Sequence, residues 1–220
     1  NLLAQGLPLG AGDEVLFSSL NHAGASVCWE HHGARRGYTV RRFPLPLDEI
    51  PAMSADELVE RHADALGERT RVLVLPHVDN VVGLLHPVAR IAARARERGV
   101  RWILVDGAQT VGMLPVDVPA LDADVFATSA HKWLQAPKGL GLAYVRRERQ
   151  PEIAPMWVTW GQERWRGDAR VFEDYGTRAL PAVLALGDAI EFQSSIPETA
   201  RAAPYRRRRR HRAARPAAGP

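Results

Sequence analysis

The chain has 220 residues, of which 46% are hydrophobic and 25% charged, values of a globular protein with room for one domain or one and a half. It contains no run of about 18 apolar residues, so no transmembrane helix is expected. Its single cysteine, Cys28, excludes an internal disulfide framework and fits a reducing cytoplasm. The net charge of +4 comes from the end of the chain, because residues 201–220 hold eight arginines and no acidic residue.

The predicted secondary structure alternates between strands and helices. Residues 1–12 have the pattern of a helix end and a turn. Apolar or alternating runs predict strands at 13–20, 39–45, 71–78, 102–105, 124–128 and 142–146. Amphipathic segments and helix-boundary signals predict helices at 30–37, 58–66, 87–98 and 179–192, the second after a capping box at 54–57. The alternation predicts an α/β fold with a mostly parallel sheet. The arginines of segment 87–98 are expected to face solvent: Arg90, Arg94, Arg96 and Arg98.

One stretch, residues 102–132, places a carboxylate and a lysine after two predicted strands. Asp106 follows the run 102–105, and Lys132 ends the sequence Ser-Ala-His-Lys that follows the run 124–128. Ligands of open parallel sheets bind outside the carboxyl ends of the strands, which makes this pair a candidate ligand site.

A lysine in such a place suggests Schiff-base chemistry, because a buried amine with a lowered pKa attacks carbonyl groups. Pyridoxal 5'-phosphate (PLP) needs such a lysine together with a carboxylate at its pyridine nitrogen. The chain has only two lysines, Lys132 and Lys138, against 27 arginines. Taken alone, an Asp or a Lys at a strand end is more often an ordinary surface charge.

Three motifs in this region resemble those of a known family. They are VDGAQ at 105–109, SAHKW at 129–133 and APKGLGLAYVR at 136–146. They resemble the class V aminotransferases of the fold-type I PLP enzymes, most closely the isopenicillin N epimerase-like and cysteine desulfurase-like branch, and the resemblance covers about residues 12–192. It implies the three-layer α/β/α large domain of PLP-dependent transferases, incomplete here, with an antiparallel last strand.

The resemblance also implies a role for each candidate residue. Lys132 would hold PLP as an internal aldimine and then shuttle protons at the substrate Cα, and Asp106 would keep the pyridine nitrogen protonated. His22 would stack on the ring. Asn80 and Gln109 would contact the phenolic oxygen of PLP. Ser129 and His131 would contact its phosphate. Gly176 and Thr177 would reach the PLP phosphate of a second subunit. No metal is expected.

Simpler interpretations of three of these residues stay open. His22 is equally a loop histidine, Asn80 a turn-forming asparagine, and Gly176-Thr177 an ordinary turn.

Two segments are predicted. Residues 1–192 would form a partial PLP-binding large domain. Residues 193–220, rich in Arg, Ala and Pro, would form a disordered tail. From the resemblance, we expect the family's phosphate-binding loop and its C-terminal small domain to lie outside this chain. Weak PLP binding and no measurable turnover are therefore expected.

Two functions remain open. The first is a PLP-dependent enzyme acting on an amino acid by transamination, epimerisation or C–S chemistry, as a cytoplasmic homodimer without membrane contact. The second is a catalytically inactive fragment or binding module that retains the fold. Nucleic acid is expected only as a non-specific partner of the Arg-rich tail.

Overall fold

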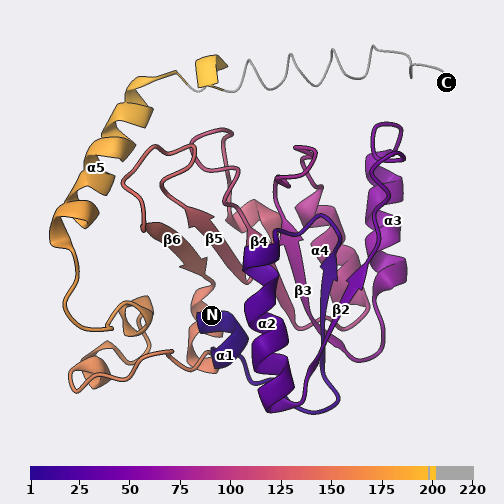
Figure 1. The fold of residues 1–220 in the computed structure, drawn as a ribbon, viewed down its shortest axis with the longest axis horizontal. Coiled ribbons are helices and arrows are strands. Elements are labelled where there is room, and N and C mark those ends of the chain that lie inside the picture. Colours follow the sequence, from indigo (N-terminus) through magenta and orange to yellow (C-terminus); the bar gives the residue numbers. More distant parts are fainter. Residues whose placement is uncertain (198, 202–220) are drawn as a thin grey trace.

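A six-stranded sheet forms the centre of the computed structural model, which describes residues 1–197 and 199–201. The strand order is β2-β1-β3-β4-β5-β6 (Figure 1). The first five strands are parallel, and β6 is antiparallel to β5, as the resemblance implies. The strands are β1 Glu14–Ser18, β2 Thr39–Phe43, β3 Thr70–Pro76, β4 Trp102–Asp106, β5 Val125–Ser129 and β6 Gly141–Val145.

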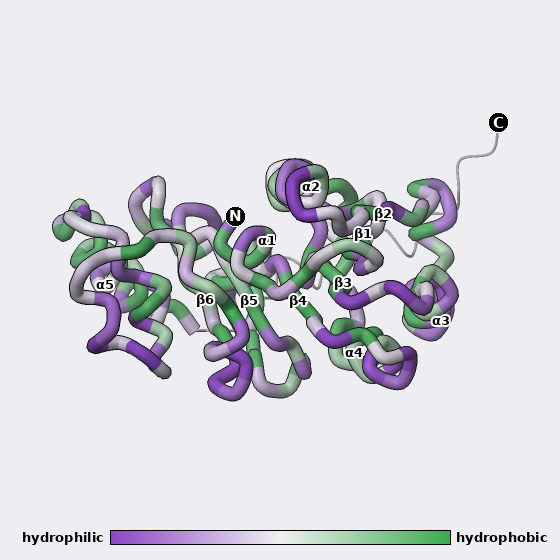
Figure 2. Tube along the Cα trace, turned by 90° about the horizontal axis from the view of Figure 1, so that it is seen from below, coloured by the Kyte–Doolittle hydropathy of each residue, from purple (hydrophilic) through white to green (hydrophobic). Residues whose placement is uncertain are grey.

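Helices cover both faces of the sheet, so the predicted three-layer α/β/α architecture is confirmed. Figure 2 shows α1 and α2 on one face and α3 and α4 on the other. Each face has its own apolar core, one built around Trp29 and Trp102 and the other around Leu73 and Ile103. The helices are α1 Leu2–Gly6, α2 Ala23–Arg36, α3 Ala55–Ala65, α4 Val88–Glu97 and α5 Leu180–Ser195, and the short 3-10 helices are η1 Pro119–Leu121, η2 Arg147–Glu152, η3 Gln162–Trp165 and η4 Ala169–Phe172.

Local signals explain where several helices begin and end. The Ser54 side chain accepts a hydrogen bond from the Glu57 backbone N–H at 3.1 Å and caps α3, as the capping box predicts. Gly37 ends α2 with a φ of 89°, in the left-handed region that glycine adopts without strain. Helix α2, of which residues 30–37 were predicted as a continuation, begins at Ala23, where His22 caps it.

Helix α5 extends beyond its predicted end. It continues to Ser195, into the segment expected to be a tail, and the buried Gln193 donates to Gln135 Oε1 at 2.7 Å. The expected disorder of residues 198 and 202–220 lies outside the described residues. Within the described part of the chain, no helix is both long and apolar enough to cross a membrane.

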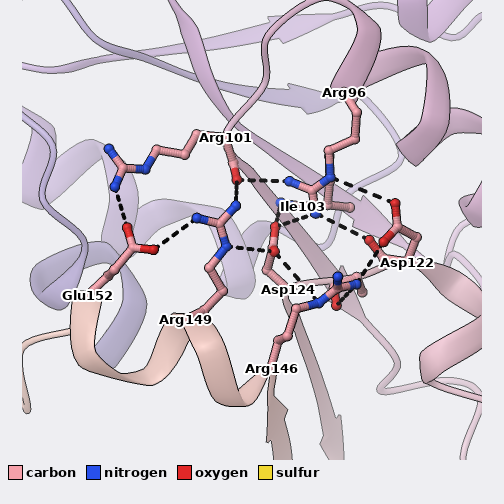
Figure 3. Close-up of polar contacts among 9 residues, drawn as sticks. Arg96, Arg101, Ile103, Asp122, Asp124, Arg146, Arg149 and Glu152 are labelled. Atoms are coloured by element: carbon pink, nitrogen blue, oxygen red, sulfur yellow. Dashed lines mark hydrogen bonds and ion pairs between the residues drawn. The ribbon is translucent and has the colours of Figure 1, made fainter.

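A charged cluster joins β4 and β5 at their amino ends (Figure 3). Its centre is Asp124, whose side chain is 1% exposed. Asp124 Oδ2 accepts from the Ile103 backbone N–H at 2.7 Å and from Arg96 Nη2 at 2.8 Å, and Oδ1 accepts from Arg149 Nε at 3.1 Å. Arg146 Nε lies 4.0 Å from the same carboxylate. The cluster therefore joins β4 and β5 at their amino ends, whereas the candidate site lies at their carboxyl ends.

The expectation that Arg96 faces solvent is wrong. It points to Asp124 and Asp122, because β5 brings these carboxylates to the end of α4. Arg90 and Arg94 do lie at the surface, where they pair with Asp56 and Glu60 of α3.

Candidate active site

The carboxyl ends of β3, β4 and β5 meet at one edge of the sheet. In the strand register, Asp106 pairs with Pro76 of β3 on one side and with Ala127 of β5 on the other. Ser129 ends β5, and Lys132 follows in the next turn. Neighbouring strand ends therefore carry Asp106 and the lysine turn, as the sequence predicts.

Asp106 is held by a turn that is bound to β5. Its Oδ1 accepts from the Ala108 backbone N–H at 2.9 Å, and Thr128 Oγ1 donates to the Gly107 carbonyl at 3.0 Å. Glycine is required at 107, because a Cβ there would lie 2.0 Å from Cζ of Phe126. Among the described residues, Oδ2 of Asp106 has no hydrogen-bond or ion-pair partner, so it can accept from a ligand.

Lys132 lies in the connection between β5 and β6, residues 130–140, which is the lysine turn. The turn is closed by the Ala130 N–H donating to the Leu140 carbonyl at 3.1 Å and the Ala136 N–H donating to the Ala130 carbonyl at 3.0 Å. Lys132 is half-buried, and its amine has no hydrogen bond or ion pair within the described ranges. Lys138, the other lysine, is exposed. The amine of Lys132 is therefore available for a reaction with a ligand.

Gln109 lies between the Asp106 turn and the lysine turn. Its Oε1 accepts a hydrogen bond from Nε1 of Trp133 at 2.8 Å. This contact was not predicted from the sequence, because it joins two loops that meet only in the folded sheet. It places Gln109 beside the residue that follows Lys132.

His22 begins α2 after β1, one strand beyond β3. Its Nδ1 accepts from the Gly24 backbone N–H at 3.1 Å, and the side chain is exposed. The sequence reasoning missed its neighbour Asn21, which is buried. Asn21 Oδ1 accepts from the Ser18 N–H at 2.8 Å, and its amide donates to the Val74 carbonyl at 3.1 Å. Asn21 thus binds the His22 loop to the ends of β1 and β3.

Asn80 lies in the turn after β3, with its side chain exposed. The neighbouring Asp79 stabilises this turn, because its carboxylate accepts from the backbone N–H groups of Val81, Val82 and Leu84 at 2.7–2.8 Å. Burial raises the pKa of Asp79, but His86 and these N–H groups outweigh it and leave the pKa below its ordinary value. Asn80 is therefore not needed to form the turn.

The residues expected to bind the phosphate fall into two groups. Ser129 ends β5, where it is half-buried, and His131 is exposed in the lysine turn. Gly176 and Thr177 are exposed in the loop that leads into α5, a helix that Figure 1 shows beyond β6. The first pair therefore adjoins Lys132, and the second pair belongs to a separate segment.

Three histidines are buried behind this edge. His77 follows β3 directly, and its backbone N–H donates to the Asp106 carbonyl at 2.8 Å. His62 of α3 lies edge-on to His86, with ring centroids 5.9 Å apart. Burial lowers the pKa of His62 to about 3, although the hydrogen bond to the Leu58 carbonyl acts to raise it. Burial also lowers the pKa of His77, to about 4. Both histidines are therefore neutral at pH 7.

Comparison with known proteins places this geometry in a family. A sequence model described as aminotransferase class-V matches residues 1–214. The chain is 38% identical to the isopenicillin N epimerase of Amycolatopsis lactamdurans over 89% of its own length and 52% of that protein's. It is 34% identical to a cysteine desulfurase of Cronobacter sakazakii over 86% of this chain and 46% of that one. The chain thus spans about half the length of these curated relatives.

Solved structures agree with the sequence comparison. The cysteine desulfurase CsdA from Escherichia coli is 28% identical and superimposes with a TM-score of 0.76. The match covers 90% of this chain and 50% of the CsdA chain. A Lys-to-Ala variant of C-DES, solved with glycine covalently linked to its PLP cofactor, is also 28% identical and gives a TM-score of 0.77. The match covers 94% of this chain and 55% of the C-DES chain. The chain belongs to the class V aminotransferase family.

Proposed function

We propose that this chain binds PLP covalently through Lys132 and forms the cofactor-binding part of an enzyme that acts on an amino acid. The observation that carries the proposal is that Asp106 and the lysine turn lie on adjacent strand ends and that, within the described residues, Asp106 Oδ2 and the Lys132 amine have no hydrogen-bond or ion-pair partner. When bound, PLP supplies an electron sink for reactions at the Cα of an amino acid. Transamination, epimerisation and C–S bond cleavage all belong to this chemistry.

The donor set at the strand ends fits PLP. The free oxygen of Asp106 can accept a charge-assisted hydrogen bond from a protonated pyridine nitrogen. The amine of Lys132 has no ion pair among the described residues that would have to break before it reacts with the carbonyl carbon of the cofactor. Ser129 and His131 offer a hydroxyl and a ring N–H for the phosphate, and His22 offers a flat ring after β1, which β3 separates from β4. Gln109 and Asn80 offer amide donors for the phenolic oxygen.

The role of Gly176 and Thr177 requires a second subunit in this proposal. Both residues are exposed in the loop before α5, so they are accessible to another copy of the chain. We therefore propose a cytoplasmic homodimer in which each subunit completes the phosphate site of the other.

Covalent trapping tests the central claim. Borohydride reduction in the presence of PLP, followed by peptide mapping, is expected to place the label on Lys132. Reduction makes the bond irreversible, so even weakly held cofactor is recorded. Lys132→Arg is expected to lose the label, and Lys138→Arg, the matched control at an exposed lysine, is expected to keep it. A label on Lys138 or on the amino terminus alone would contradict the assignment, as would an unlabelled wild-type chain, which would favour a non-catalytic module.

The Asp106 carboxylate gives a second prediction. Asp106→Asn is expected to weaken PLP binding by about 1.5–3 kcal/mol, because a charge-assisted hydrogen bond is replaced by contact with an amide. The PLP concentration for half-maximal trapping measures this change. Asp117→Asn, at an exposed carboxylate in the loop before η1, is the control and should match the wild type. Equal concentrations for Asp106→Asn and the wild type would exclude the contact.

A further inference from the structure

The loop after β4 and the loop after β5 are held together at two points. The first is the hydrogen bond from Nε1 of Trp133 to Oε1 of Gln109. The second is a close approach of Gly112 to the backbone of Trp133. A Cβ at 112 would lie 2.4 Å from both the carbonyl carbon and the oxygen of Trp133, and the φ of 89° at Gly112 also favours glycine.

The indole of Trp133 determines which way the Gln109 amide is oriented. An indole N–H donates and cannot accept, so the atom facing it must be the amide oxygen. The opposite end of the amide is then Nε2, which carries two N–H donors and no acceptor. An amide without such a partner can present either end to its surroundings.

We propose that Trp133 is a positioning residue, which orients Gln109 so that only N–H donors face the cofactor. This inference rests on the proposed function. The matching acceptor is an oxygen that carries negative charge, the phenolic oxygen of PLP. The reversed amide would place its own oxygen against that charge, so the indole excludes the repulsive orientation.

The orientation has a measurable consequence. An N–H donor from Gln109 would stabilise negative charge on the phenolic oxygen and so lower the pKa at which the bound cofactor loses its proton. Removing the indole N–H lets the amide turn, and the apparent pKa of the bound cofactor then rises. The effect belongs to Trp133 although its side chain need not touch the cofactor.

The hydrogen bond can be tested without cofactor. In a ¹H–¹⁵N spectrum of the protein, the indole signal of Trp133 is identified by its loss in Trp133→Phe. Gln109→Leu is expected to shift this signal and to speed its exchange with solvent, leaving the other five tryptophans unchanged. An unchanged Trp133 signal in Gln109→Leu would overturn the inference.

The cofactor-loaded protein supplies the second test. With saturating PLP, the pH titration of the visible absorption band is expected to shift upward by about half to one pKa unit in Trp133→Phe. Gln109→Glu, which presents an oxygen at either end, should shift it at least as far. Trp160→Phe makes the same change at a tryptophan that is 97% exposed and should leave the titration unchanged.

Two failures can be told apart. A wild-type chain that retains no PLP would overturn the proposed function and the role of Gln109 with it. A wild-type chain that titrates normally, with Trp133→Phe matching it, would overturn this inference alone.

Discussion

Replacing Asp124 by asparagine is expected to lower the free energy of unfolding by about 3–5 kcal/mol. The carboxylate is almost fully buried and accepts from a backbone N–H and from two arginines. The asparagine amide removes the negative charge and leaves Arg96 and Arg149 facing each other without their shared counter-ion. Urea unfolding of the two proteins at neutral pH measures the difference.

Asp122 supplies a matched control two residues away. It pairs with Arg146 at 2.7 Å and with Arg96 at 3.8 Å, but its side chain is 46% exposed. Asp122→Asn is therefore expected to cost about 1 kcal/mol or less, and asparagine tolerates the left-handed backbone at this position, where φ is 52°. Equal losses for the two variants would show that burial does not set the strength of this cluster.

Acidification from pH 7 to pH 5 is expected to cost the fold about 4 kcal/mol through two buried histidines. The pKa values of His62 and His77, about 3 and about 4, lie below the ordinary value of 6.5. The unfolded chain therefore takes up protons that the folded chain does not. This contribution to stability is fully present above pH 6.5 and falls as the pH drops towards 4 and 3. At pH 5 each histidine accounts for about 2 kcal/mol.

Above pH 5, the loss of stability on acidification comes from the histidines and not from the carboxylates. Glu14 and Asp79 have lowered pKa values, and their contribution is lost only below the ordinary values of 4.5 and 3.8. His62→Gln keeps a donor for the Leu58 carbonyl but does not titrate, so it should remove about 2 kcal/mol of the pH dependence. His31→Gln, at an exposed histidine of α2, is the control. An undiminished pH dependence in His62→Gln would refute the assignment.

The sequence was sufficient where the signal is local. Apolar or alternating runs identify all six strands. Asp106 and Lys132 could be selected because Asp106 directly follows one run and Lys132 ends the Ser-Ala-His-Lys sequence after another. The ends were predicted less closely: β1 stops at Ser18 because Asn21 turns the chain back onto it, and the start of α2 at Ala23, capped by His22, was not predicted.

Contacts between distant segments could not be read from the sequence. Arg96 carries the helical spacing of a surface arginine, and its partner Asp124 follows 28 residues later. The pairing of Gln109 with Trp133 requires that two loops meet, and nothing in either loop alone indicates it. Asn80 was singled out by resemblance, whereas the hydrogen bonds of the turn belong to Asp79.

The position of the lysine turn also bears on the order of folding. Lys132 lies in the connection between β5 and β6, an antiparallel pair of five residue pairs from Val125↔Val145 to Ser129↔Gly141. The loop that this pair closes, residues 130–140, is shorter than the connection 107–124 between β4 and β5, so the pair can form earlier. Asp106 joins it through the three parallel residue pairs between β4 and β5 and through the hydrogen bond from Thr128 to Gly107, across a longer connection. We therefore expect the lysine turn to form before Asp106 is placed beside it, so that the pairing of β4 with β5 is the last step in folding of the candidate site.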